Sequence, residues 1–247
     1  MPTITAIGFD ADDTLWETEI SYVSTKEEFA HLLSGYSSFE QVKAELDVIE
    51  TNNVQLYGYG FKSFTLSMIE TALQVSGGNV PASIIGQVLE RAKQVLQSEI
   101  KLIDGVEAVL HALHENSPQY CLFLITKGEL FEQQRKIDRS GLRPYFHVTE
   151  VVPDKTPEAY ARLLHMHNIP PEQFLMIGNS LRSDILPVIS IQGWAVLVPH
   201  PLTWSHETTP EQEVPTGRWF EIPTIGELPG FLNQFDELAG GNLSKED

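Results

Sequence analysis

The chain has 247 residues, of which 42% are hydrophobic and 20% are charged. That is enough apolar material for one large globular domain, or for a domain with an insert, and it excludes a disordered or low-complexity chain. Acidic residues outnumber basic ones by 34 to 16, and a net charge of −18 repels both nucleic-acid phosphates and anionic lipid headgroups. We therefore expect neither nucleic acid nor a membrane as a partner.

The cysteine content and the absence of targeting signals indicate the compartment. The single cysteine, Cys121, has no intrachain disulfide partner, and its apolar neighbours predict a buried structural thiol. Met1–Asp10 lacks the basic region of a signal peptide. Residues 185–206 contain no charged side chain, but glycine and prolines would break a spanning helix there. We expect a soluble, cytoplasmic protein.

Five short apolar runs predict the strands of one sheet. In chain order they are Ile4–Phe9, Cys121–Ile125, Phe146–Val152, Phe174–Ile177 and Trp194–Val198, of which the third is the weakest. Runs of this length without polar alternation are typical of strands that are buried on both faces, as in a parallel sheet.

The segment from residue 17 to about residue 100 has a different pattern. Apolar side chains recur there at helical spacing, in the sets Phe39, Val42, Leu46, Ile49 and Ile84, Ile85, Val88, Leu89, Ala92, Val95, Leu96. Glycine-containing breaks separate these sets, and no alternating strand pattern occurs. The segment is predicted to be an all-helical insert after the first strand.

Helices and strands alternate again from residue 104 onward. Apolar residues from Val106 to Leu113 predict a helix with Asp104 as its N-cap, and Leu130, Gln134 and Ile137 predict one that stops at Gly141. Thr156–Pro157 reads as the N-cap and first residue of another helix, and the polar tail Asp236–Asp247 is expected to fray. The alternation predicts an α/β, doubly wound (Rossmann-like) parallel sheet, formed by residues 1–16 and 100–247 around an insert at 17–99.

Polar residues follow the first four predicted strands where each one ends. They are Asp10, Asp12 and Thr14, then Thr126, Lys127 and Gly128, then Lys155, and then Asn179, Ser180 and Asp184. Ligands of a parallel α/β sheet bind outside the carboxyl ends of its strands, so these groups should share one edge. Carboxylates together with a lysine and backbone amides suit the binding of Mg²⁺ and a phosphoryl group, because the cation reverses the local negative field.

These motifs resemble, in type and order, those of the haloacid dehalogenase-like hydrolase superfamily. The chain has Asp-x-Asp-x-Thr after a strand, Thr-x-Gly after the next, a lysine ahead of a helix, and Gly-Asn-Ser followed by an aspartate. Each motif is weak alone, but four in order from Asp10 to Asp184 form a strong signal. The insert resembles the family's helical cap, which closes over the site and selects substrates.

The resemblance also implies a role for each residue. Asp10 would be the nucleophile that forms an aspartyl-phosphate, and Asp12 the general acid and then the base, with its backbone carbonyl on Mg²⁺. Lys155 would neutralise charge on Asp10 and on the phosphoryl group. Phosphate oxygens would be bound by Thr126 and by the amides around Lys127 and Gly128. The metal site would comprise Asp10, Asp12, Asn179 and Asp184.

Asn179 departs from the aspartate that many phosphatases of the family carry at this position. An amide offers only a neutral oxygen, so we expect weaker Mg²⁺ binding than in an aspartate version. The family's dehalogenases also have asparagine in this motif and need no metal, but they lack a carboxylate two residues after the nucleophile. This chain has Asp12, the proton donor that cleavage of a phosphate ester requires.

The sequence therefore predicts a Mg²⁺-dependent phosphomonoester hydrolase that acts on a small-molecule phosphate ester. A metal-independent 2-haloacid dehalogenase is the enzymatic alternative. A non-enzymatic alternative is a phosphoacceptor module, in which Mg²⁺, a threonine and a lysine also surround an aspartate, although such modules are about half as long and lack the insert. A catalytically silent scaffold is the last alternative, and the presence of both Asp10 and Asp12 argues against it.

Overall fold

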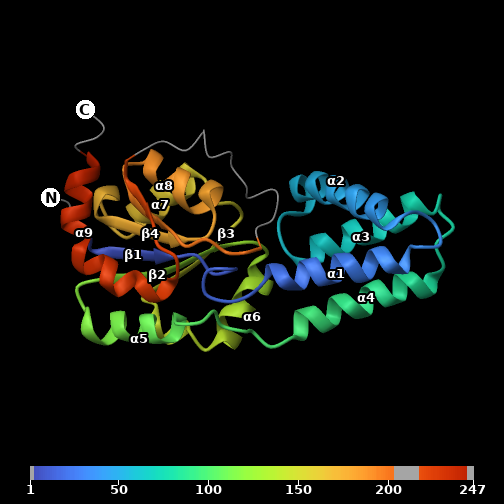
Figure 1. The fold of residues 1–247 in the computed structure, drawn as a ribbon, viewed down its shortest axis with the longest axis horizontal. Helices are drawn as coiled ribbons and strands as arrows, with labels where there is room; N and C mark the ends of the chain where they lie inside the picture. Colours follow the sequence, from blue (N-terminus) through green and yellow to red (C-terminus); the bar gives the residue numbers. More distant parts are fainter. Residues whose placement is uncertain (1–2, 203–216, 244–247) are drawn as a thin grey trace. The chain divides into compact units, whose positions relative to one another are not determined.

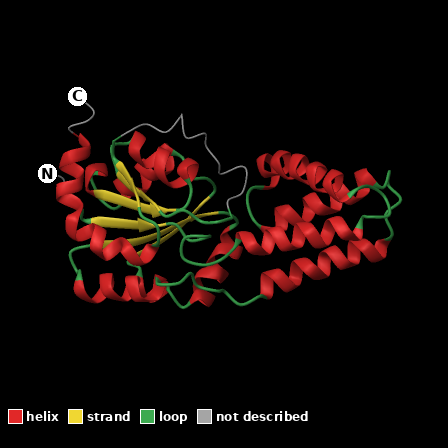
Figure 2. Ribbon diagram, in the orientation of Figure 1, coloured by secondary structure: helices red, strands yellow, loops and turns green. Residues whose placement is uncertain are grey.

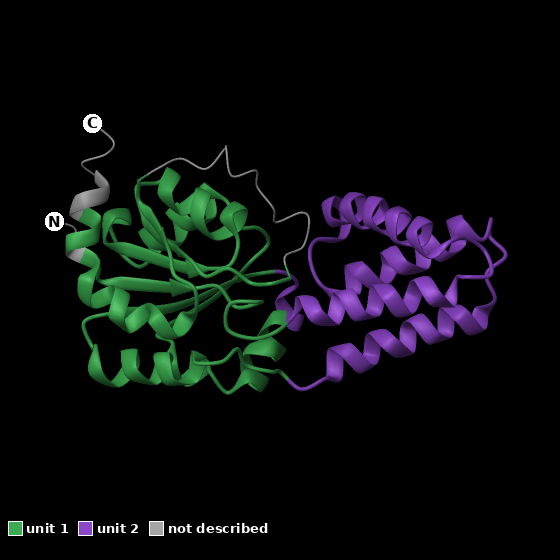
Figure 3. Ribbon diagram, in the orientation of Figure 1, with its two compact units in different colours: residues 1–17, 100–127, 133–247 green, residues 18–99, 128–132 purple. Residues whose placement is uncertain are grey.

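The structure, a computed structural model, describes residues 3–202 and 217–243. The chain divides into two compact units (Figure 3). One comprises residues 1–17, 100–127 and 133–247, and the other comprises residues 18–99 and 128–132. The helices of the described residues fall short of the length and apolarity that crossing a bilayer requires.

The first unit is built on a parallel sheet (Figures 1 and 2). The described residues form six strands in the order β3-β2-β1-β4-β5-β6. Their bounds are Ala6–Phe9 for β1, Cys121–Lys127 for β2, Val148–Val152 for β3, Phe174–Gly178 for β4, Trp194–Leu197 for β5 and Trp219–Glu221 for β6. The doubly wound α/β prediction is confirmed, and β6 is a strand that the sequence reading missed.

Helices cover both faces of this sheet (Figure 1). Alternate strand residues, such as Ile7 and Leu124, pack with α5 (Val106–Asn116), α6 (Leu130–Ser140) and α9 (Leu228–Leu243). The other set, which includes Phe123 and Met176, packs with α7 (Pro157–Met166) and α8 (Leu186–Ser190). Each fully buried Leu, Ile or Phe contributes roughly 1.5–3 kcal/mol, so burial on both faces explains why β1, β4 and β5 are continuous apolar runs.

The helix ends of this unit follow local signals, with two corrections to the sequence reading. Thr156 caps α7 by accepting from the Ala159 N–H, and α6 ends before Gly141 at a φ of 74°, as predicted. The residue before α5 is Gly105, at a φ of 87°, so Asp104 is not its N-cap. The predicted frayed tail is also wrong as far as Leu243, because α9 buries Phe235 and Ala239 against the sheet.

The second unit contains four helices in residues 18–99. They are α1 (Glu19–Leu32), α2 (Phe39–Tyr57), α3 (Phe61–Val75) and α4 (Ala82–Gln97). Their core includes Phe29, Leu46 and Phe64. A capping box between Ser38 and Gln41 starts α2, and the Phe61 N–H at the start of α3 donates to both carboxylate oxygens of Glu132, at 3.1 Å each.

Candidate active site

Asp10 is the first residue after β1. Its backbone N–H continues the ladder to β4 by donating to the Ile177 carbonyl at 2.9 Å. The residue is 6% exposed, and each of its carboxylate oxygens has a donor. The Thr14 hydroxyl donates to Oδ2 at 2.9 Å, and the Lys155 ammonium donates to Oδ1. The carboxylate is thereby fixed at the carboxyl edge of the sheet.

Lys155 is three residues beyond β3 and is 4% exposed. Its Nζ bridges Asp10 and Asp184, with a distance of 2.7 Å to the Asp184 Oδ1. The other Asp184 oxygen accepts from the Ser180 N–H at 3.0 Å, which ties this carboxylate to the turn after β4. A cation that is buried between two anions is well compensated, so the lysine is not the solvated surface side chain that its sequence context alone would suggest.

The charges of this cluster shift one another's pKa values. Burial raises the pKa of Asp10 to about 7, against the opposing effect of Lys155 and with a further rise from Asp184. Burial alone would lower the pKa of Lys155, but Asp10 and Asp184 outweigh it and hold the pKa well above its usual range. Lys155 is therefore a permanent cation, whereas Asp10 titrates near neutral pH.

Asp12 points its carboxylate to a different set of donors. Trp16 Nε1 donates to Oδ1 at 2.7 Å and Gln133 Nε2 donates to Oδ2 at 2.8 Å. Lys136 Nζ lies 3.0 Å from both oxygens. Asp10 and Asp12 thus have separate cationic partners, although they are two residues apart.

The residues of the second motif lie on β2 and just beyond it. Thr126 is buried near the end of the strand, beside β1 in the sheet. The Lys127 ammonium donates to the Ser183 hydroxyl at 2.8 Å, so it reaches the turn after β4. Gly128 groups with the second unit. Three neighbouring strands therefore supply these groups. β2 ends with Thr126 and Lys127, Asp10 follows β1, and Lys155 follows β3.

The oxygen atoms near Asp10 suit a hard divalent cation. Asn179 Oδ1 and Asp10 Oδ2 both face the Thr14 hydroxyl, at 3.4 and 2.9 Å. A carboxylate oxygen, an amide oxygen and a backbone carbonyl are the donor types that Mg²⁺ binds. The carboxylate of Asp184 is engaged by Lys155 and by the Ser180 N–H, so Asp184 is placed to orient the lysine.

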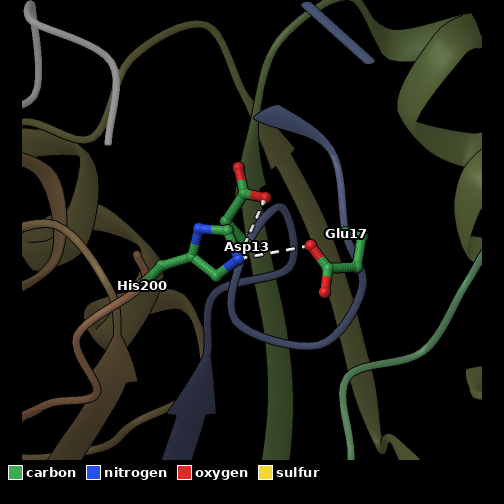
Figure 4. A group of neighbouring side chains, drawn as sticks. All are labelled: Asp13, Glu17 and His200. Atoms are coloured by element: carbon green, nitrogen blue, oxygen red, sulfur yellow. Dashed lines mark hydrogen bonds and ion pairs between the residues drawn. The ribbon is translucent and has the colours of Figure 1, made fainter. Parts of the chain in front are cut away.

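A separate group of possible ligands includes Asp13, the residue after Asp12 (Figure 4). Among the described residues, the His, Cys, Asp or Glu ligand atoms that cluster within 4.8 Å belong to Asp13, Glu17 and His200. His200 Nε2 is 3.3 Å from Glu17 Oε2 and 3.9 Å from Asp13 Oδ1. The predicted metal residues are a different set: Asp10, Asp12, Asn179 and Asp184. In the structure Lys155 Nζ contacts both Asp10 and Asp184, and Lys136 contacts the Asp12 carboxylate.

Several residues of the site were given no role in the sequence reading. Thr14 belongs to the Asp-x-Asp-x-Thr motif, and in the structure its hydroxyl lies within hydrogen-bond distance of both Asp10 and Asn179. Gln133 and Lys136 lie one helical turn apart on α6, which is the signal that could have identified them as one face. Tyr160 donates to the Ser183 carbonyl at 3.1 Å, and burial holds the pKa of its hydroxyl well above the usual range.

The fold and site define an enzyme of the doubly wound α/β class with a buried aspartate–lysine pair at the carboxyl edge of its sheet. The chain belongs to the haloacid dehalogenase-like hydrolase family, whose family model matches residues 4–189. No curated protein matches the chain.

Solved structures extend the likeness over nearly the whole chain. A haloacid dehalogenase-like family hydrolase from Xanthomonas campestris is 38% identical, with a TM-score of 0.83 over 96% of this chain and 94% of that one. YfnB, a hydrolase of this family from Bacillus subtilis solved with magnesium, is 20% identical, with a TM-score of 0.63 over 94% and 99%. A 2-haloacid dehalogenase from Pseudomonas syringae pv. Tomato is 17% identical, with a TM-score of 0.59 over 94% and 100%.

Proposed function

We propose that this hydrolase is a Mg²⁺-dependent phosphomonoesterase that acts on a small-molecule phosphate ester. The observation that carries the proposal is the pair of carboxylates at the end of β1, each beside its own lysine. Asp10 contacts Lys155 and Asp12 contacts Lys136. One carboxylate beside a buried cation suits a nucleophile, and a second, more accessible one suits proton transfer.

In the proposed reaction an Asp10 oxygen attacks phosphorus, and the bond to the leaving oxygen breaks. Asp12 gives its proton to that oxygen, so the alcohol leaves neutral and an aspartyl-phosphate remains. Asp12 then takes a proton from water as the water attacks phosphorus, which releases inorganic phosphate and restores the Asp10 carboxylate. Lys155 offsets negative charge at Asp10 and on the transferring group throughout.

Phosphate binding is assigned to β2 and the turn that follows it. The Thr126 hydroxyl and the backbone amides around Lys127 and Gly128 would donate to phosphate oxygens. Asp10, the Asp12 backbone carbonyl and Asn179 would hold Mg²⁺, with Asp184 completing the site directly or through water. When bound, Mg²⁺ would supply positive charge against the phosphoryl oxygens. YfnB, with the same fold, was solved with magnesium, which supports this choice of ion.

The helical insert, residues 17–99, is proposed to be the cap that selects the substrate. A cap that must close leaves room for a small molecule rather than for a folded protein, and closure excludes bulk water during transfer. Within the insert, Phe61 and Phe64 are buried in the helical core, whereas the Tyr57 side chain is exposed.

A panel of phosphate esters, assayed for phosphate release with Mg²⁺ and with chelator, tests the proposal. We expect Mg²⁺-dependent turnover of at least one ester and none with Asp10→Asn. Activity that survives in Asp10→Asn would falsify the nucleophile assignment.

A 2-haloacid dehalogenase is the second candidate, and Asn179 beside Asp10 is the observation that favours it. This reading predicts chloride release from a 2-haloacid in the presence of chelator, with little effect of Asp12→Asn. Chloride release without metal, combined with inert phosphate esters, would establish the dehalogenase.

A further inference from the structure

Donors from two parts of the chain contact the Asp12 carboxylate. Trp16 lies in the turn after β1, while Gln133 and Lys136 lie on α6. The Lys136 Nζ is 3.0 Å from each oxygen, so it straddles the carboxylate rather than pairing with one corner of it. Donors on both oxygens restrain rotation about the last side-chain bond, which leaves the carboxylate one orientation.

The surroundings of Gln133 and Lys136 are unusual for polar side chains. Gln133 is 2% exposed, and its Nε2 also donates to the Lys127 carbonyl at 3.1 Å. The Lys136 side chain is 17% exposed, although a helix surface would let it extend into water. Ordering a lysine side chain costs up to about 2 kcal/mol of rotamer entropy, and burying an amide adds a desolvation cost. The contacts of both side chains with the Asp12 carboxylate offset these two costs.

We propose that Lys136, supported by Gln133, is a positioning residue that fixes the Asp12 carboxylate for proton transfer. The inference deepens the proposed phosphatase function and rests on it. Lys136 need not touch the substrate, because it acts through the orientation of Asp12. Proton transfer requires the donor and acceptor atoms to be within hydrogen-bond reach, so a carboxylate that turns freely should deliver its proton less often.

The leaving group distinguishes this role from a structural one. An alkoxide must be protonated as it departs, whereas p-nitrophenolate leaves without a proton. Loss of a residue that acts through Asp12 should therefore slow formation of the aspartyl-phosphate, which kcat/KM reports, far more for alkyl phosphates than for p-nitrophenyl phosphate. Loss of general stability would slow both equally.

The test compares kcat and KM of wild type and Lys136→Met on both kinds of ester, with Mg²⁺. We expect kcat/KM for the alkyl ester to fall about 100-fold, the lower end for acid–base catalysis. For p-nitrophenyl phosphate the fall in kcat/KM should stay under about tenfold. Lys136→Arg should restore most of the loss, and the exposed Lys93→Met should match wild type.

A double mutant tests whether Lys136 acts through Asp12. In an Asp12→Asn background, adding Lys136→Met should change kcat by less than about twofold. Gln133→Met should show the same leaving-group pattern with a smaller loss, which serves if Lys136→Met does not fold by thermal melting. Equal losses of kcat/KM on both esters, a higher kcat/KM of Lys136→Met than of wild type, or additive effects with Asp12→Asn would each overturn the positioning role. If wild type hydrolyses neither ester, the proposed function fails and this inference fails with it.

Discussion

Two aspartates separated by one residue meet different surroundings in this enzyme. Asp10 is buried beside a buried lysine, and burial raises its pKa to about 7. Asp12 keeps 26% of its side chain exposed beside Lys136, Gln133 and Trp16. Identical functional groups in different environments take different chemical roles, which is how the proposed reaction divides attack from proton transfer.

The neutral oxygen of Asn179 leads to a prediction about metal affinity. Asn179→Asp adds a negative charge beside Asp10, so we expect Mg²⁺ to bind about tenfold more tightly, a size typical of changes around a metal site. Isothermal titration calorimetry measures this directly. The control is Asn52→Asp at an exposed position of α2, which makes the same charge change in the helical unit. Unchanged or weaker Mg²⁺ binding in Asn179→Asp would contradict the prediction.

The raised pKa of Asp10 predicts how Mg²⁺ binding depends on pH. With a pKa of about 7, Asp10 holds a proton below neutral pH and must lose it before it can ligate the metal. Mg²⁺ affinity should therefore fall about tenfold per pH unit below 7 and level off above it. Calorimetry in two buffers of different ionisation enthalpy counts the protons released. About one proton is expected at pH 6 and few at pH 8; equal release at both would refute the assignment.

At the scale of the elements, the end of β4 requires glycine at residue 178, because a side chain there would clash with Asp184. A Cβ at Gly178 would lie 2.2 Å from Asp184 Oδ2 and 2.6 Å from Asp184 Cβ, so Gly178→Ala must displace Asp184. Since Asp184 holds Lys155, we expect kcat/KM to fall about 100-fold, the cost of misplacing a site by about 1 Å. Gly86→Ala in α4 has no atom within 4 Å of its new Cβ and serves as the control. Full activity in Gly178→Ala would show that Lys155 does not need Asp184.

The helical unit contains its own buried charge pair, which predicts a stability effect. Lys26 of α1 donates to Asp47 and Glu50 of α2, and Glu50 is 6% exposed. Burial raises the pKa of Glu50 despite Lys26. Lys26→Met leaves that carboxylate without this partner, so unfolding free energy should fall by about 2 kcal/mol, measured by urea denaturation. Lys93→Met, which breaks an exposed pair with Glu90, should change it by less than about 0.5 kcal/mol. Equal effects would contradict the argument.

The position of helix α6 was predicted from the sequence, but its buried face was not. The periodicity predicted the helix and its end at Gly141, but it assigned Leu130 and Gln134 to the buried face. Both are exposed, and Gln133 and Lys136 face inward with Ile137. An apolar period cannot find a face whose buried members are polar, because their burial depends on Asp12, more than a hundred residues earlier.

For the whole molecule, the helical unit has a core made of its own residues, so residues 18–99 should fold alone. The buried side chains of α1–α4 pack on one another, and the Glu132 contact to the start of α3 is the part that the fragment would lose. We expect helical circular dichroism and a cooperative melt, with about 1 kcal/mol less stability from the lost hydrogen bonds. A fragment without a cooperative melt would contradict this, and substituting Glu132→Ala in the full chain isolates the contribution of that contact.

The sheet was predictable because apolar runs and strand-end polar residues are local signals. The strands β1, β2 and β4, their parallel direction and the edge that carries Asp10 follow from patterns within ten residues. Side-chain partners are different, since Thr14 meets Asn179 across 165 positions. The partner of a buried charge depends on packing that no short window of sequence contains, as in the contact of Lys155 with Asp184, 29 positions later.

The strand order affects the sequence of events in folding. β1 pairs with β4, which lies far along the chain, and the helical unit is inserted between β1 and β2. Loop-closure entropy makes such distant pairings slow, so local helices form long before these strands meet. A newly synthesised chain would therefore form much of its helix before it has any catalytic activity. That activity would appear only in the last step of folding.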